Sequence, residues 1–127
     1  MASVLVVEDD EAYRTALRKL ITLCFPGTQV VEAEDGATAL SVTRLISFDV
    51  IILDYYLHAM GGGDVARYLR QRVNAGSRKT PIILTSSQPD VELFTRVIGA
   101  SAFLHKPCKA DQLAALLGPL LLKNDEP

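Results

Sequence analysis

The chain has 127 residues, of which 49 % are apolar and 22 % are charged, and its formal net charge is −2. This length and composition fit one globular domain that can bury a core without a disulfide framework or a structural metal. The acidic balance argues against sequence-independent binding of nucleic acid, and no apolar stretch approaches the roughly 18 residues that span a membrane. Cys24 and Cys108 fit no metal-binding spacing, so we interpret them as reduced thiols of a cytoplasmic protein.

Short apolar runs alternate with helical patterns five times along the chain. In chain order, the expected strand and helix pairs are Val4–Val7 and Glu11–Cys24, Gln29–Ala33 and Ala37–Ile46, Val50–Leu53 and Val65–Val73, Pro81–Leu84 and Pro89–Ile98, and Ala102–His105 and Ala110–Leu117. A polar loop is expected over Asn74–Thr80, and the Gly118-Pro119 pair is expected to end or kink the last helix. We expect one domain over residues 1–122 and a disordered tail over residues 123–127.

Regular alternation of strand and helix predicts a parallel sheet with right-handed crossovers and with helices on both faces. In such a sheet, ligands bind at the carboxyl ends of the strands. Four of the apolar runs end in polar residues of different kinds, namely Glu8-Asp9-Asp10, Asp54, Thr85 and Lys106. Carboxylates, a hydroxyl and an amine that meet at one edge of a sheet make a site for a divalent cation and a phosphoryl group.

These residue types suit metal-assisted transfer of a phosphoryl group to a carboxylate. Mg²⁺ prefers hard oxygen ligands and is typically held by one or two carboxylates together with phosphate oxygens. A carboxylate that attacks phosphorus is repelled by anionic oxygens, and a metal ion offsets that repulsion. Lys106 can supply a second positive charge, and Thr85 can donate a hydrogen bond to a phosphoryl oxygen.

Each of these signals has an ordinary structural explanation when it is taken alone. A solvated acidic loop would explain Glu8-Asp9-Asp10, and a surface lysine would explain Lys106, but their coincidence at four strand ends disfavours both explanations. The remaining polar and glycine residues of these segments are interpreted structurally: Asp10 as an N-cap, His58 as an exposed loop residue, His105 as a strand residue, and Gly61-Gly62-Gly63 as a flexible loop.

From Val4 to about Leu117, the chain resembles the receiver domain of two-component response regulators. That family has an acidic pair after the first strand, an aspartate after the third, Thr or Ser after the fourth and Lys-Pro after the fifth, and all four features occur here in order. The resemblance implies a flavodoxin-like, doubly wound (βα)5 fold. Its five-stranded parallel sheet has the order 2-1-3-4-5 and carries helices on both faces.

The resemblance also implies roles for the site residues. Asp54 is implied to be the phosphoacceptor, and Lys106 and Thr85 are implied to contact its phosphoryl group. The side chains of Asp9 and Asp54 and the backbone carbonyl of Tyr56 are implied to bind Mg²⁺, or Mn²⁺, and Glu8 is implied to hold the ion through water.

A conformational switch is implied as well. Thr85 and Phe103 would change the surface formed by Asp90–Ile98, the fifth strand and the last helix when the phosphoryl group arrives. We also expect Tyr56 and Ser87 to tune dephosphorylation, because the bulk of Tyr56 can exclude the attacking water.

The implied phosphoryl donor is a sensor histidine kinase or a histidine phosphotransfer protein, and the chain is expected to be a phosphoacceptor rather than a turnover enzyme. We expect a stand-alone receiver without direct nucleic-acid or membrane binding. A cluster of leucines favours a partner or homodimer surface at the last helix, although these residues could instead fold back onto the domain: Leu116, Leu117, Leu120, Leu121 and Leu122.

Three other functions compete with this interpretation. A haloacid-dehalogenase-like phosphatase needs a second aspartate two residues after its nucleophile, where this chain has Tyr56. A pseudo-receiver that acts only as an interaction module usually lacks one of the acids or the lysine, which are all present here. A flavin carrier on the same fold would bind phosphate after the first strand, where Glu8-Asp9-Asp10 would repel it.

Overall fold

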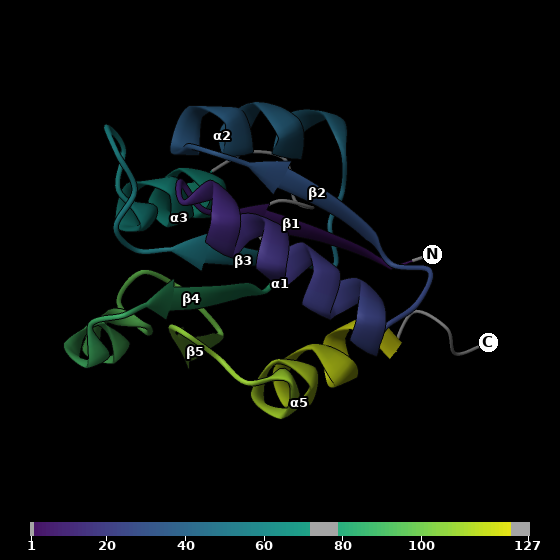
Figure 1. Cartoon of the computed structure of the whole chain (residues 1–127). Helices are drawn as coiled ribbons and strands as arrows, with labels where there is room; N and C mark the ends of the chain where they lie inside the picture. The colour runs from purple at the N-terminus through teal and green to yellow at the C-terminus, as the bar shows by residue number, and fades with distance from the viewer. Residues whose placement is uncertain (1, 72–78, 123–127) are drawn as a thin grey trace.

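The computed structural model describes residues 2–71 and 79–122. Five parallel strands form one sheet in the order β2-β1-β3-β4-β5, which confirms the predicted flavodoxin-like topology (Figure 1). The strands are β1 (Ser3–Val7), β2 (Gln29–Ala33), β3 (Val50–Asp54), β4 (Ile82–Ser86) and β5 (Ala102–His105). The helices are α1 (Glu11–Cys24), α2 (Gly36–Leu45), α3 (Gly62–Gln71), the 3₁₀ helix η1 (Pro89–Phe94) and α5 (Ala110–Leu121).

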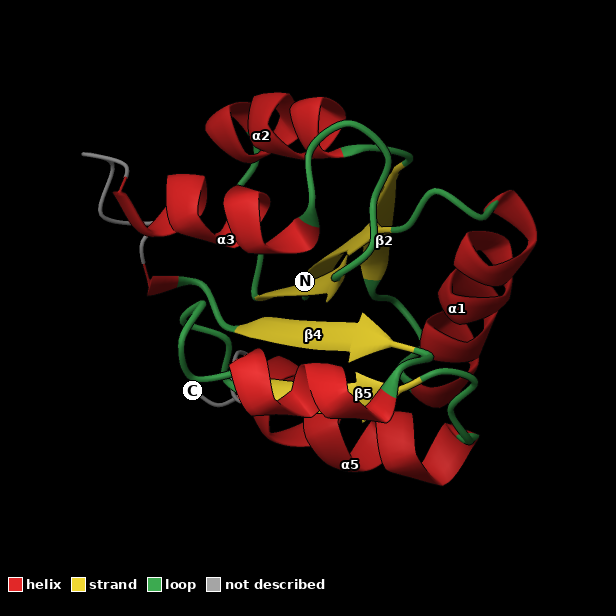
Figure 2. Ribbon diagram, turned by 90° about the vertical axis from the view of Figure 1, so that its left-hand side faces the viewer, coloured by secondary structure: helices red, strands yellow, loops and turns green. Residues whose placement is uncertain are grey.

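Helices cover both faces of the sheet because its central strands are apolar on both sides. β1, β3 and β4 are buried along their whole length. Alternate residues of a strand face opposite sides, so Val4 and Ile52 pack with α1 and α5, whereas Leu5 and Ile51 pack with α2 and α3. Figure 2 shows α2 and α3 on one side of β4 and α5 on the other.

Most predicted boundaries agree with the structure to within a few residues. α1, β2 and β5 have the predicted bounds, and Asp10 is confirmed as the N-cap of α1, because its side chain accepts the Tyr13 backbone N–H at 3.1 Å. The α-helix expected over Pro89–Ile98 is wrong in type: a 3₁₀ helix ends at Phe94, and turns follow it. Most of the loop predicted over Asn74–Thr80 lies outside the described residues.

The predicted end of the last helix at Gly118-Pro119 is wrong, because α5 continues through Pro119 to Leu121, and the alternative of a kink there stays a prediction. The proline lies in the last turns, so few helical hydrogen bonds are affected, and burial of Leu117 and Leu121 favours an intact helix. The five leucines expected to form a partner or dimer surface lie in different environments, and the surface itself stays a prediction. Leu116 and Leu120 also pack against the core, and only Leu122 of the five is strongly exposed.

The predicted flexible loop at Gly61-Gly62-Gly63 is also wrong for its last two residues, which begin α3. The Gly62 N–H donates to the Tyr55 carbonyl at 2.9 Å. A Cβ added at Gly62 would lie 2.2 Å from the Asp54 carbonyl oxygen and 2.8 Å from the Tyr55 Cα. Glycine at this position thus allows the start of α3 to pack directly on the end of β3.

Candidate functional site

The carboxyl ends of four strands bring the predicted site residues together. Glu8 and Asp9 follow β1, Asp54 is the last residue of β3, and Lys106 follows β5. The β3–β4 register pairs Asp54 with Thr85. Because alternate residues share a face and Ile52 and Ile83 both pack on the α1 and α5 side, Asp54 and Thr85 lie on that side as well.

Three carboxylates form the acidic part of this site. One oxygen from each of Glu8, Asp9 and Asp54 lies within 4.8 Å of the other two. Glu8 and Asp54 are only 2 % and 3 % exposed, whereas Asp9 is half-buried. Hard carboxylate oxygens at this spacing fit the donor preference of Mg²⁺ or Mn²⁺.

The Lys106 ammonium is the counter-charge of the cluster. Its Nζ donates to Glu8 Oε1 and, at 3.1 Å, to Asp54 Oδ2. Burial alone would lower the pKa of Lys106, but hydrogen bonds and charge from the two carboxylates together raise it. Burial, aided by the neighbouring Asp54 carboxylate, raises the pKa of Glu8 to about 7 despite the Lys106 contact. The Lys106 contact therefore does not offset the effect of burial on Glu8.

Two serines follow Thr85, and they lie in different environments. Thr85 is buried at the end of β4, and its carbonyl accepts the Tyr55 N–H at 2.9 Å. Ser86 is buried on the other face of the strand and accepts the Gln88 N–H at 3.0 Å. Ser87 is exposed. Thr85 is thus the hydroxyl on the same face as Asp54.

Aromatic rings flank the end of β3. The Tyr56 side chain is 56 % exposed, and its backbone N–H donates to Asp54 Oδ1 at 3.2 Å. The Tyr55 ring meets Tyr56 edge-on at 5.0 Å and stacks on Phe94 of η1, with the ring centroids 5.8 Å apart. Sequence reasoning singled out Tyr56 and missed Tyr55, which connects the end of β3 to η1 through this stack.

Tyr13 and Cys108 are further residues of the site that sequence reasoning missed. The Lys106 Nζ lies 4.9 Å from the centre of the Tyr13 ring, and the Tyr13 hydroxyl lies 4.0 Å from Cys108 Sγ. Burial, followed by the neighbouring Cys108, raises the pKa of Tyr13, so its phenol is neutral at physiological pH. Burial also raises the pKa of Cys108. In the sequence, Tyr13 belongs to the apolar stripe of α1, so its pattern indicated only core packing.

His58 approaches the site from the loop after β3. Its Nε2 lies 3.1 Å from Asp9 Oδ2, but its side chain is 92 % exposed. The prediction of an exposed loop residue is confirmed, although its carboxylate partner was not foreseen. A contact exposed to this degree contributes little to stability.

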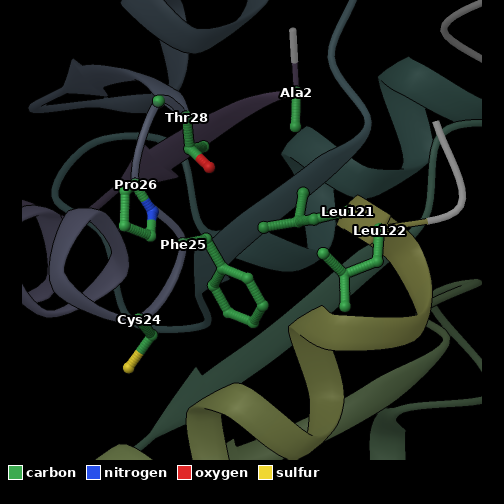
Figure 3. Close-up of a pocket in the computed structure, with 8 residues that line it drawn as sticks. Ala2, Cys24, Phe25, Pro26, Thr28, Leu121 and Leu122 are labelled. Atoms are coloured by element: carbon green, nitrogen blue, oxygen red, sulfur yellow. The ribbon is translucent and has the colours of Figure 1, made fainter. Parts of the chain in front are cut away.

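Two of the pockets that the described residues form lie away from the carboxylate cluster. Phe103 is half-buried and lines a pocket of about 390 Å³ together with Glu92 of η1 and Leu116 of α5. A second pocket, of about 400 Å³, lies between the ends of α1 and α5 and is lined by Phe25, Leu121 and Leu122 among others (Figure 3). It also includes Ala2, which precedes β1, so it lies at the opposite edge of the sheet from Asp54.

Comparisons with known proteins agree with this geometry. Residues 4–118 match the family model of the response regulator receiver domain. The chain is 31 % identical to the two-component response regulator ORR41 of Oryza sativa subsp. japonica, with 96 % of each chain covered. The structure of the chemotaxis response regulator CheY4 of Vibrio cholerae superposes with a TM-score of 0.82 and 28 % identity, covering 95 % of this chain and 99 % of that one.

Other relatives are longer than this chain. It is 34 % identical to a part of the sensor histidine kinase AruS of Pseudomonas aeruginosa, covering 91 % of this chain and 12 % of that protein. It spans 47 % of the nitrate/nitrite response regulator protein NarP of Escherichia coli, with 36 % identity over 81 % of this chain. Within residues 2–71 and 79–122, every helix is too short or too polar to cross a membrane.

Proposed function

The chain belongs to the response regulator receiver domain family of two-component systems, and on that premise we propose that Asp54 accepts a phosphoryl group from a phosphohistidine. The donor is a sensor histidine kinase or a histidine phosphotransfer protein. In this step an Asp54 carboxylate oxygen forms a bond to phosphorus, and the bond between phosphorus and the histidine nitrogen breaks. The observation that carries the proposal is the buried Asp54 carboxylate, which lies beside the acidic pair after β1 and accepts a hydrogen bond from the Lys106 ammonium.

The site residues divide between metal binding and phosphoryl binding. Glu8, Asp9 and Asp54, together with the Tyr56 carbonyl, would hold Mg²⁺ or Mn²⁺. When bound, the ion supplies positive charge that offsets repulsion between the carboxylate and the phosphoryl oxygens. Lys106 contacts Asp54 Oδ2 in this state and can move to a phosphoryl oxygen, since the two positions are adjacent.

We further propose that the new phosphoryl charge is sensed by Thr85 and transmitted to Phe103. Thr85 lies opposite Asp54 in the sheet, and Phe103 is paired with Leu84 on the neighbouring strand. The surface that changes would include η1, β5 and α5, whose residues line the pocket next to Phe103. A homodimer formed through α5 could use Leu122, which is the most exposed of the five leucines, together with the exposed parts of the half-buried Leu116 and Leu120.

The proposal also covers the extent and the class of the protein. Residues 1–122 form the receiver domain, consistent with the match over residues 4–118. The chain acts as a phosphoacceptor that assists its own phosphorylation and dephosphorylation, without turning over a separate substrate. Tyr56, which is exposed next to Asp54, and Ser87 would tune how long the phosphoryl group persists.

The decisive experiment is phosphorylation by acetyl phosphate with Mg²⁺, followed by intact mass spectrometry. Wild-type protein should gain one phosphoryl group, and Asp54→Asn should gain none. Asp64→Asn is a matched control, because Asp64 is an exposed carboxylate on α3 that pairs with Arg67. Labelling of Asp54→Asn at the wild-type level would overturn the assignment, and a wild type that stays unlabelled with every donor would favour a pure interaction module.

A further inference from the structure

We propose that Tyr13 is a positioning residue for Lys106, and that its ring holds the Lys106 ammonium against Asp54 during phosphoryl transfer. The inference rests on the proposed function, because it assigns a device that serves the same reaction. In the sequence, Tyr13 has only the periodicity of a core residue of α1. The proposed role follows from the arrangement of groups around the ammonium.

Among the residues that the structure describes, the Lys106 ammonium has three neighbours that matter here. Two are the carboxylates of Glu8 and Asp54, which accept its hydrogen bonds. The third is the Tyr13 ring, whose centre lies 4.9 Å from Nζ. The Lys106 side chain is only 18 % exposed, so this cation–π contact is partly shielded from water. Cation–π contacts are stronger when they are shielded in this way.

Tyr13 is itself fixed from two directions. Its backbone N–H donates to the Asp10 cap at 3.1 Å, which anchors it in the first turn of α1. Its hydroxyl reaches Cys108 Sγ at 4.0 Å, two residues after Lys106. Tyr13 therefore links the beginning of α1 to the segment after β5 and gives the ring a defined place beside the ammonium.

An uncharged ring is suited to a lysine whose partners change during the reaction. A metal ion would compete with Lys106 for Glu8, and a phosphoryl group would replace one Asp54 oxygen as an acceptor. The attraction of the ammonium to the ring depends on the ring quadrupole rather than on either carboxylate. Lys106 can thus exchange its anionic partner while one contact remains constant.

The test compares Tyr13→Leu, which removes the ring, with Tyr13→Phe, which keeps the ring and removes only the hydroxyl. With acetyl phosphate, we expect Tyr13→Leu to lower the phosphorylation rate by up to about tenfold, within the range of a shielded cation–π contact. Tyr13→Phe should stay within about twofold of wild type. Thermal melting verifies that both variants fold, and leucine preserves an apolar contact with the core.

A double-mutant cycle separates positioning from general structural damage. In a Lys106→Met background, Tyr13→Leu should have no further effect on the phosphorylation rate beyond about twofold. If the loss caused by Tyr13→Leu is as large in that background as in wild type, Tyr13 does not act through Lys106 and the inference is overturned. Equal rates for wild type and Tyr13→Leu would overturn it as well.

A second readout is independent of phosphorylation. The Tyr13 ring current should shift the NMR signals of the Lys106 methylene protons nearest Nζ in wild type and in Tyr13→Phe, but not in Tyr13→Leu. Identical Lys106 shifts in wild type and Tyr13→Leu would refute the contact itself. If wild type shows the ring-current shift but accepts no phosphoryl group, the proposed function fails while the contact stands, so the two failures can be distinguished.

Discussion

Replacement of Gly62 by alanine should strongly destabilise the domain, because the new methyl group would collide with the backbone that carries Asp54. The added Cβ would lie 2.2 Å from the Asp54 carbonyl oxygen and 2.8 Å from the Tyr55 Cα. Ordinary contacts begin near 3.4 Å, so the start of α3 or the end of β3 has to move by about 1 Å. Neither element is a flexible side chain that could turn away.

The adjacent Gly63 provides a matched control. A Cβ at Gly63 would meet only side-chain atoms, Ile98 Cγ2 at 3.8 Å and Tyr55 Cε2 at 3.9 Å, which are ordinary contact distances. Both glycines lie in the first turn of α3, so alanine gains similar helix propensity at each position. The difference between the two variants therefore isolates the collision at Gly62.

The expected loss for Gly62→Ala is about 3 kcal/mol, the upper end of overpacking costs, which corresponds to a fall in melting temperature of about 10 °C for a domain of this size. Gly63→Ala should leave stability unchanged or raise it by up to about 1 kcal/mol. Urea unfolding followed by circular dichroism measures both. If the two variants unfold at the same urea concentration, the close approach of α3 to β3 is not present in solution and the reasoning fails.

Three further predictions concern the charge and access of the site. Millimolar Mg²⁺ should raise the melting temperature of wild type. Asp9→Asn should remove most of that increase, whereas Asp10→Asn should keep it, because Asp10 caps α1. An equal increase in both variants would contradict the ligand assignment. Because the pKa of Glu8 is raised from 4.5 to about 7 in the folded state, metal-free protein should lose stability as the pH rises through that interval. Glu8→Gln should flatten this dependence in chelator-treated samples, and an unchanged slope would argue against a protonated Glu8. Tyr56→Asn should accelerate loss of the phosphoryl group by up to about tenfold, measured as decay of purified phosphoprotein without a kinase; the same decay rate as wild type would mean that Tyr56 does not restrict water.

The grouping of polar residues at the strand ends could be predicted from the sequence, because the topology of the sheet determines it. Once alternation of strand and helix implies a parallel sheet, the polar residues after each apolar run must meet at one edge. That is why Glu8, Asp54 and Lys106 could be grouped from the sequence before any distance was known. The chemistry of such a site is carried by residue type and order, which the sequence states directly.

Features that depend on packing could not be predicted in the same way. Tyr13 has the periodicity of a core residue, and only the path of the segment after β5 brings Lys106 over its ring. Gly62 resembled a loop glycine in the sequence. The atoms that crowd it belong to the backbone of Asp54 and Tyr55, which lies outside the pattern of α3. Pro119 suggested a helix end, but burial of Leu121 outweighs the lost hydrogen bond.

The core between α1 and α5 has a consequence for how the chain matures during synthesis. Leu17 and Ile21 of α1 share one cluster with Leu113, Leu117 and Leu121 of α5. The apolar face of α1 therefore stays exposed until α5 emerges from the ribosome. The acidic cluster follows the same order, since its carboxylates are all translated before residue 55 and Lys106 arrives much later. A nascent chain that lacks β5 and α5 therefore carries both an open apolar face and uncompensated negative charge, and synthesis of these two elements relieves both at once.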